Sequence, residues 1–76
     1  MKIAKVYDNG GQTFDRYTII LEGHPDALGL SENCDSPQGF SQFGVAVDGR
    51  HLGRQISFED FPENVKRHTN QRIRQL

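Results

Sequence analysis

The sequence predicts one small α+β domain over residues 1–76, in which an antiparallel sheet of three to five short strands carries one C-terminal helix. Three observations predict this fold. Two β-rich segments near the N-terminus flank Asp8-Asn9-Gly10-Gly11, whose residues tolerate the positive φ angles of hairpin turns. Short β-compatible segments follow, separated by turn formers. From Ser57 onward, apolar side chains recur at helical spacing.

The first predicted strand covers residues 2–7 and the second covers Phe14 to Glu22. Apolar side chains alternate along the second strand, so that one of its faces would carry Tyr17, Ile19 and Leu21. A strand with this many apolar side chains is typically a central strand of a sheet. We expect these two strands to form an antiparallel hairpin.

Residues 23–26 contain Pro25 and predict a turn, and Leu28 to Leu30 can form a brief third strand. The next stretch, Leu30 to Phe43, is rich in turn-forming residues, which favours a compact loop over a regular element. Beyond it, Asp48-Gly49 lies between β-compatible residues and predicts a second hairpin over residues 45–52. Residues 53–56 continue in extended form.

Ser57 and Asp60 have the spacing of an N-cap and an acidic residue three positions later. Pro62 interrupts a continuous helix but suits a first helical turn, so we expect one turn over residues 57–61 and a helix from Pro62. Its core-facing stripe would be Phe58, Phe61, Val65, Thr69 and Leu76, with Ile73 at the edge.

Charge and composition exclude several classes of protein. The net charge of −1 provides no overall field that attracts nucleic acid or anionic lipid. The N-terminus lacks the apolar region of a signal peptide, and no apolar run is long enough to span a membrane. A lone cysteine cannot form an intramolecular disulfide, which fits a reducing compartment. We therefore expect a cytoplasmic protein with no membrane partner.

No motif specifies a chemistry. Cys34 could pair with His24 or His51 as thiolate and base, or join Asp26 and Asp35 in a metal site, but the local ligand spacings typical of zinc sites are absent. We therefore expect no catalytic residues, no metal and no cofactor, and treat the thiol as incidental. The chain is predicted not to be an enzyme, and an enzyme that uses Cys34 or a histidine is the distant alternative.

The Leu30 to Phe43 loop has two interpretations. Phe40 and Phe43 can turn inward to close the small core, or the loop can present an aromatic recognition surface, and both can hold at once. The second interpretation predicts a binding or regulatory module that contacts a protein, or a second copy of itself, through this loop or an exposed sheet edge. Its candidate binding residues are Ser36, Pro37, Gln38, Phe40, Gln42 and Phe43.

The alternative function is nucleic-acid binding by the C-terminal helix. The last fourteen residues have a net charge of +3, whereas residues 1–62 have a net charge of −4. Lys66, Arg67 and Arg74 would lie on the polar side of the helix, where they could contact phosphates. Cations near a helix C-terminus are also favoured by the helix dipole alone, so the pattern has a purely structural explanation.

Several segments together resemble a group of short uncharacterised bacterial and phage-type proteins. They are Asp8-Asn9-Gly10-Gly11, Asp15-Arg16-Tyr17-Thr18, Ser31-Glu32-Asn33, Ser36-Pro37-Gln38-Gly39-Phe40, and Leu52-Gly53 through Phe58-Glu59-Asp60-Phe61-Pro62. The resemblance covers most of the chain. It implies a compact accessory protein and no particular activity.

Overall fold

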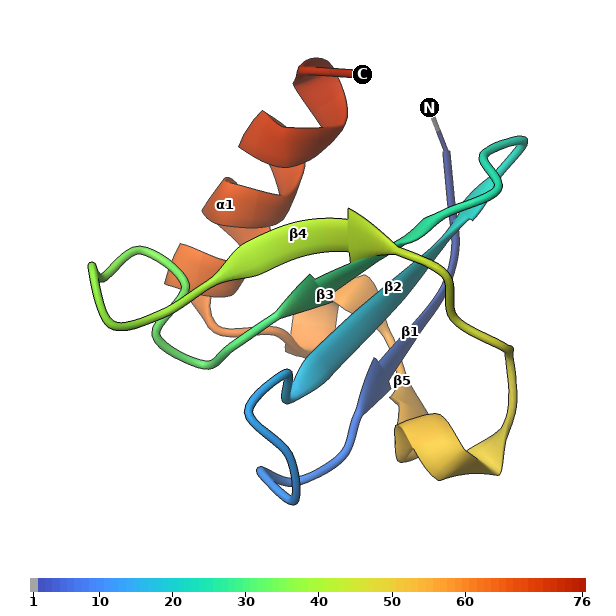
Figure 1. Ribbon diagram of the computed structural model, residues 1–76, viewed down its shortest axis with the longest axis horizontal. Helices are drawn as coiled ribbons and strands as arrows, with labels where there is room; N and C mark the ends of the chain where they lie inside the picture. Colours follow the sequence, from blue (N-terminus) through green and yellow to red (C-terminus); the bar gives the residue numbers. More distant parts are fainter. Residues whose placement is uncertain (1) are drawn as a thin grey trace.

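A five-stranded antiparallel sheet forms the centre of the computed structural model, which describes residues 2–76 (Figure 1). Its strands are β1 (Lys2–Asp8), β2 (Tyr17–Glu22), β3 (Ala27–Leu30), β4 (Ser41–Gly44) and β5 (Arg54–Ile56). They lie in the order β4-β3-β2-β1-β5, so that β4 and β5 form the two edges. One α-helix of the described chain, α1 (Glu63–Arg74), packs on one face. The predicted α+β class is confirmed.

The β1–β2 connection is longer than a tight hairpin turn. Asn9 organises it, because its side-chain oxygen accepts hydrogen bonds from the backbone N–H groups of Gly11 and Gln12 at 2.9 and 3.2 Å. Because the connection is long, β2 begins at Tyr17, and the prediction that this strand begins at Phe14 was wrong. Phe14 lies in the loop with 63% of its surface exposed.

A row of apolar side chains crosses the sheet beneath α1. Direct cross-strand pairs join its members, which are Ile56, Val6, Ile19, Leu28 and Phe43, one from each strand. Val65 and Thr69 of α1, together with Phe61 just before the helix, cover this row, and all three are buried as the sequence predicts. Leu76 does not complete the stripe, because α1 ends at Arg74 and leaves Leu76 50% exposed.

The helix begins as predicted. Ser57 caps a short 3-10 helix, Phe58–Asp60, and Asp60 accepts a hydrogen bond from the Ser57 backbone N–H at 3.0 Å, which completes a capping box. Pro62 then occupies the N-cap of α1, where its missing N–H costs nothing.

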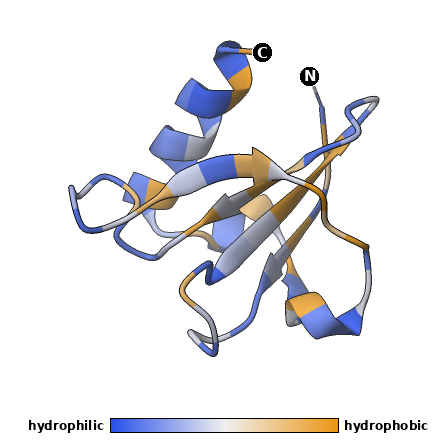
Figure 2. Cartoon of the chain, viewed as in Figure 1, coloured by the Kyte–Doolittle hydropathy of each residue, from blue (hydrophilic) through white to orange (hydrophobic). Residues whose placement is uncertain are grey.

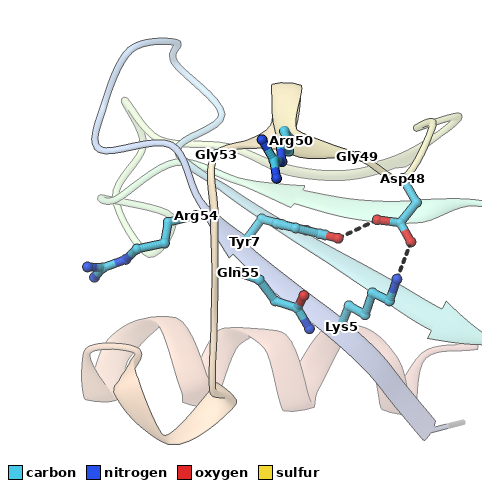
Figure 3. Close-up of a pocket in the computed structure, with 8 residues that line it drawn as sticks. All are labelled: Lys5, Tyr7, Asp48, Gly49, Arg50, Gly53, Arg54 and Gln55. Atoms are coloured by element: carbon cyan, nitrogen blue, oxygen red, sulfur yellow. Dashed lines mark hydrogen bonds and ion pairs between the residues drawn. The ribbon is translucent and has the colours of Figure 1, made fainter.

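The segment Val45–Gly53, called here the strap, crosses the sheet face opposite α1. It joins β4 to β5, which lie at opposite edges, so it passes over the intervening strands (Figures 1 and 3). Asp48 fixes it there by accepting hydrogen bonds from Lys5, at 2.7 Å, and from the hydroxyl of Tyr7. The predicted hairpin around Asp48-Gly49 was wrong, because the strap has to span the sheet from β4 to β5 and so does not double back on itself. Its end instead forms a 3-10 helix, Arg50–Leu52.

Asp8 and Arg16 form an ion pair that closes the β1–β2 connection, with 18% and 31% of their side chains exposed. The Arg16 guanidinium, at 2.8 Å, lowers the pKa of the Asp8 carboxyl. Since the folded pKa lies below the unfolded value, the stabilisation is present above about pH 4 and is lost as the pH falls through the folded pKa.

We expect Asp8→Asn to reduce the free energy of unfolding at pH 7 by about 1 kcal/mol and to flatten its decline below about pH 5. Urea denaturation over a pH series measures both effects. The matched control is Glu22→Gln, because Glu22 and Lys2 form an exposed pair at 3.8 Å and should contribute little. Parallel pH profiles for wild type and Asp8→Asn would contradict the assignment.

Candidate functional site

The candidate loop is ordered by its own backbone. Ser31 accepts a hydrogen bond from the Phe40 N–H at 2.9 Å and donates its own N–H to the Phe40 carbonyl at 3.1 Å, so the two ends are clamped together. A Cβ at Gly39 would lie 1.9 Å from the Asn33 carbonyl oxygen, so no other residue fits there. The predicted compact loop therefore exists. It ends at Phe40, however, because the next residues belong to β4.

The six candidate binding residues do not form one surface. Ser36, Pro37 and Gln38 lie at the loop tip, where the Ser36 hydroxyl is 2.6 Å from the Gln38 side-chain oxygen. Phe40 and Gln42 lie on the strap side of the sheet. Phe43 lies on the α1 side and packs against the core, as the structural interpretation requires.

Phe43 and Phe40 have different surroundings. The Phe43 ring lies beneath the guanidinium of Arg72, 5.3 Å from its centre, and packs against core residues. Phe40 stacks on the exposed ring of Phe14, with centroids 5.1 Å apart and planes 10° from parallel. Phe43 therefore packs against the core, whereas Phe40 belongs to an aromatic pair whose other ring, Phe14, is exposed to solvent.

Two clefts border the strap. One, of about 360 Å³, is lined mainly by small or apolar residues of β3, β4 and the strap, and by Phe40 of the loop before β4. Val45 and Val47 at its rim are 89% and 72% exposed. The sequence analysis missed them as binding residues, because it assigned them to a hairpin. The run of uncharged residues before Asp48 was the sequence feature that could have indicated an exposed binding segment.

The other cleft, of about 630 Å³, is lined mainly by residues with charged or polar groups and lies between the strap and β1 (Figure 3). Its floor holds Lys5 and Tyr7, both bound to Asp48. The hydrogen bond to this carboxylate raises the pKa of Tyr7, so the phenol stays protonated and is not a general base. Arg50 and Arg54 border the cleft.

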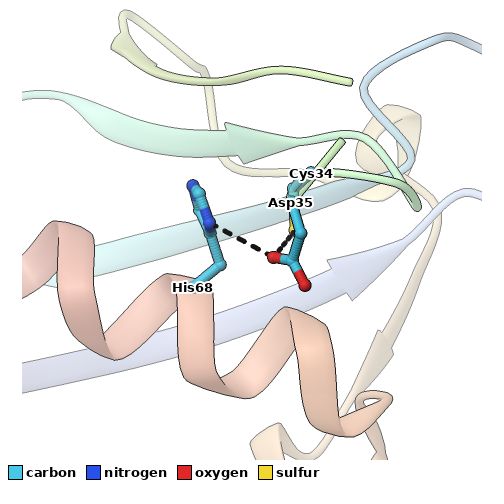
Figure 4. Close-up of side chains that lie close together, drawn as sticks. All are labelled: Cys34, Asp35 and His68. Atoms are coloured by element: carbon cyan, nitrogen blue, oxygen red, sulfur yellow. Dashed lines mark hydrogen bonds and ion pairs between the residues drawn. The ribbon is translucent and has the colours of Figure 1, made fainter. Parts of the chain in front are cut away.

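A third cluster joins the candidate loop to α1 on the opposite face (Figure 4). Asp35 Oδ1 lies 3.8 Å from Cys34 Sγ and 3.4 Å from His68 Nδ1, and Asp35 Oδ2 accepts a hydrogen bond from Arg67 at 3.0 Å. His68 Nε2 in turn lies 2.7 Å from Ser41 Oγ. Sequence analysis paired Cys34 with the wrong histidines. His24 lies in the β2–β3 turn and His51 in the strap, whereas packing of α1 brings His68 to the thiol.

The cluster holds two side chains of nucleophilic type, Cys34 and Ser41, and their surroundings differ. Burial and the neighbouring Asp35 carboxylate raise the pKa of the Cys34 thiol, so it is protonated at neutral pH. Ser41, His68 and Asp35 have the connectivity of a catalytic triad, which also needs a substrate cleft and oxyanion donors. The two clefts beside the strap lie on the other face of the sheet from Ser41 and His68.

Two of the four lysine and arginine residues of α1, Lys66 and Arg67, form ion pairs with acids. Lys66 lies 2.8 Å from Glu63 and 3.8 Å from Glu59, and its pKa is raised by the hydrogen bond to Glu63. Arg67 is held by Asp35, and Arg74 is exposed. Nucleic-acid binding through Lys66, Arg67 and Arg74 stays a prediction, and these ion pairs do not favour it.

No family model, curated protein or solved structure matches this chain. The likeness to phage-type accessory proteins therefore stays a prediction. Within residues 2–76, no helix has the length and apolar character needed to cross a membrane.

We expect Phe43→Ala to lower the free energy of unfolding by about 2 kcal/mol, because the change leaves a space beside the core. Phe40→Ala should cost about 1 kcal/mol or less, since its partner Phe14 is mostly exposed. Urea denaturation of both variants tests the distinction. Equal losses would show that Phe40 is as much a core residue as Phe43.

We expect Cys34 to react with iodoacetamide at least about tenfold more slowly in the folded protein than in the urea-unfolded chain, because burial limits access and disfavours the thiolate. Mass spectrometry of the alkylated fraction against time measures both rates. A native rate equal to the unfolded rate would show that the thiol is accessible and ionised.

Proposed function

We propose that this chain is a non-enzymatic protein-binding module that adds a strand of its partner to the outer edge of β4. The observation that carries the proposal is the exposure of Val45 and Val47, at 89% and 72%, in the uncharged segment that continues from this edge. Figure 2 shows the apolar colour of the segment that follows β4. Burying each valine would contribute about 1.5–3 kcal/mol before the costs of association.

The edge itself supports the proposal. Within residues 2–76, β4 pairs only with β3, and in an antiparallel ladder every second residue directs its N–H and C=O groups away from the neighbour it pairs with. Proteins usually protect such edges with charged residues, proline or a bulge. Residues 41–47 contain no charged residue and no proline. The outer edge is therefore open to another strand.

A second copy of the chain is the partner that we assign to this edge. Antiparallel pairing of β4 with β4 is self-complementary about a two-fold axis, so one surface serves both chains. Neither β4 nor the three strap residues that follow it, Val45 to Val47, carry a charge, so two copies placed side by side at this edge meet no charge repulsion there. A domain of 76 residues has a small core and gains stability from association. A cytoplasmic, accessory role is part of the proposal and is supported by the single free thiol, Cys34.

We expect the molecular mass of the wild type to rise from monomer to dimer with concentration, and the double variant Val45→Lys/Val47→Lys to stay monomeric. Two lysines on each chain would face each other across the edge and repel. Sedimentation velocity over a concentration series measures the mass. Unchanged circular dichroism and urea midpoint would show that the double variant is folded.

Leu76→Lys is the matched control, because Leu76 is also an exposed apolar residue, at 50%, but lies at the C-terminus. It should dimerise like the wild type. The proposal is wrong if the wild type is monomeric throughout, or if the double variant dimerises as strongly as the control.

A further inference from the structure

We propose that Cys34, Asp35 and His68 bind a divalent transition-metal ion, with zinc the best match to their donor atoms. The three residues come from the loop after β3 and from α1, and their donor atoms all lie within 4.8 Å of one another (Figure 4). The metal proposal does not rest on the proposed strand addition, because none of its ligands lies on the outer edge of β4.

The spacing of the donor atoms fits tetrahedral coordination. Zinc bonds of about 2.0–2.3 Å at tetrahedral angles hold ligand atoms roughly 3.3–3.7 Å apart. Asp35 Oδ1 lies 3.4 Å from His68 Nδ1 and 3.8 Å from Cys34 Sγ. Both separations are within a few tenths of an ångström of the required values. The third pair, Cys34 Sγ and the His68 nitrogen, lies within 4.8 Å, so binding one ion requires these two side chains to rotate toward each other around Asp35.

Neighbouring groups hold the ligands in a binding orientation. Ser41 Oγ lies 2.7 Å from Nε2 of His68, which leaves Nδ1 facing the site. Arg67 binds Asp35 Oδ2 at 3.0 Å and so leaves Oδ1 for the ion. Metal ligands in proteins are commonly oriented by such partners. His68 keeps 21% of its side chain exposed, which gives the ion a route to the buried Cys34.

The donor set selects the class of metal. A thiolate and an imidazole are ligands for zinc and related transition metals, whereas magnesium and calcium prefer oxygen. Binding replaces the thiol proton of Cys34, which passes to the buffer, and forms bonds to sulfur, oxygen and nitrogen without a redox step. Three protein ligands leave the fourth position for water.

The test uses untagged protein titrated with Co²⁺, whose thiolate charge-transfer and tetrahedral d–d absorption bands report the ligands, and with Zn²⁺ as competitor. We expect one Co²⁺ per chain, displaced by Zn²⁺. Cys34→Ser should abolish the thiolate band, and His68→Gln and Asp35→Asn should each weaken binding at least about tenfold. His24→Gln and His51→Gln are the controls and should bind like the wild type.

Absence of a thiolate band in the wild type with excess Co²⁺ would overturn the proposal. So would binding that survives both His68→Gln and Asp35→Asn, or binding weakened as much by the two control substitutions. Circular dichroism identifies any variant that fails to fold. Should His68→Gln unfold, Asp35→Asn carries the same test, because Asp35 lies in a loop and its loss removes no core packing.

Discussion

The need to cover both faces of a five-stranded sheet with only 76 residues governs the rest of this structure. The described chain has one α-helix, which covers the apolar row from Ile56 to Phe43 on one face. No second helix is left for the other face. The strap, Val45–Gly53, covers part of it instead, and Asp48 holds the strap by hydrogen bonds to Lys5 and Tyr7. These polar contacts let a short segment without a core of its own remain on the sheet.

The proposed binding edge follows from the same constraint. A strap that must span the sheet cannot also fold back to cover β4, because β5 lies at the far edge. Val45 and Val47 therefore remain exposed beside a strand that has no neighbour on its outer side among residues 2–76. The aromatic pair of Phe14 and Phe40 borders the same face. Because a single short segment covers the face opposite α1, the first residues of the strap remain accessible to a partner.

Local patterns in the sequence predicted most of the secondary-structure elements, because each of these patterns lies within a few consecutive residues. The capping box of Ser57 and Asp60 predicted where the helical region begins, and alternation predicted the buried face of β2. The Asp48-Gly49 hairpin failed because it depended on strand order, which no local pattern reports. The cluster around Cys34 was missed for the same reason. Its histidine is brought to the thiol only when α1 packs against the loop after β3.

The two proposed sites share one strand. Ser41 is the first residue of β4, and its hydroxyl contacts the histidine of the proposed metal site, while the outer edge of β4 is the proposed pairing surface. An ion held by Cys34, Asp35 and His68 would restrict the position of Ser41 and so the entry of the chain into β4. Restricting a strand in its paired conformation lowers the entropy cost of adding another strand to it. Coupling between binding equilibria is reciprocal, so pairing at β4 would strengthen metal binding by the same factor that the metal strengthens pairing.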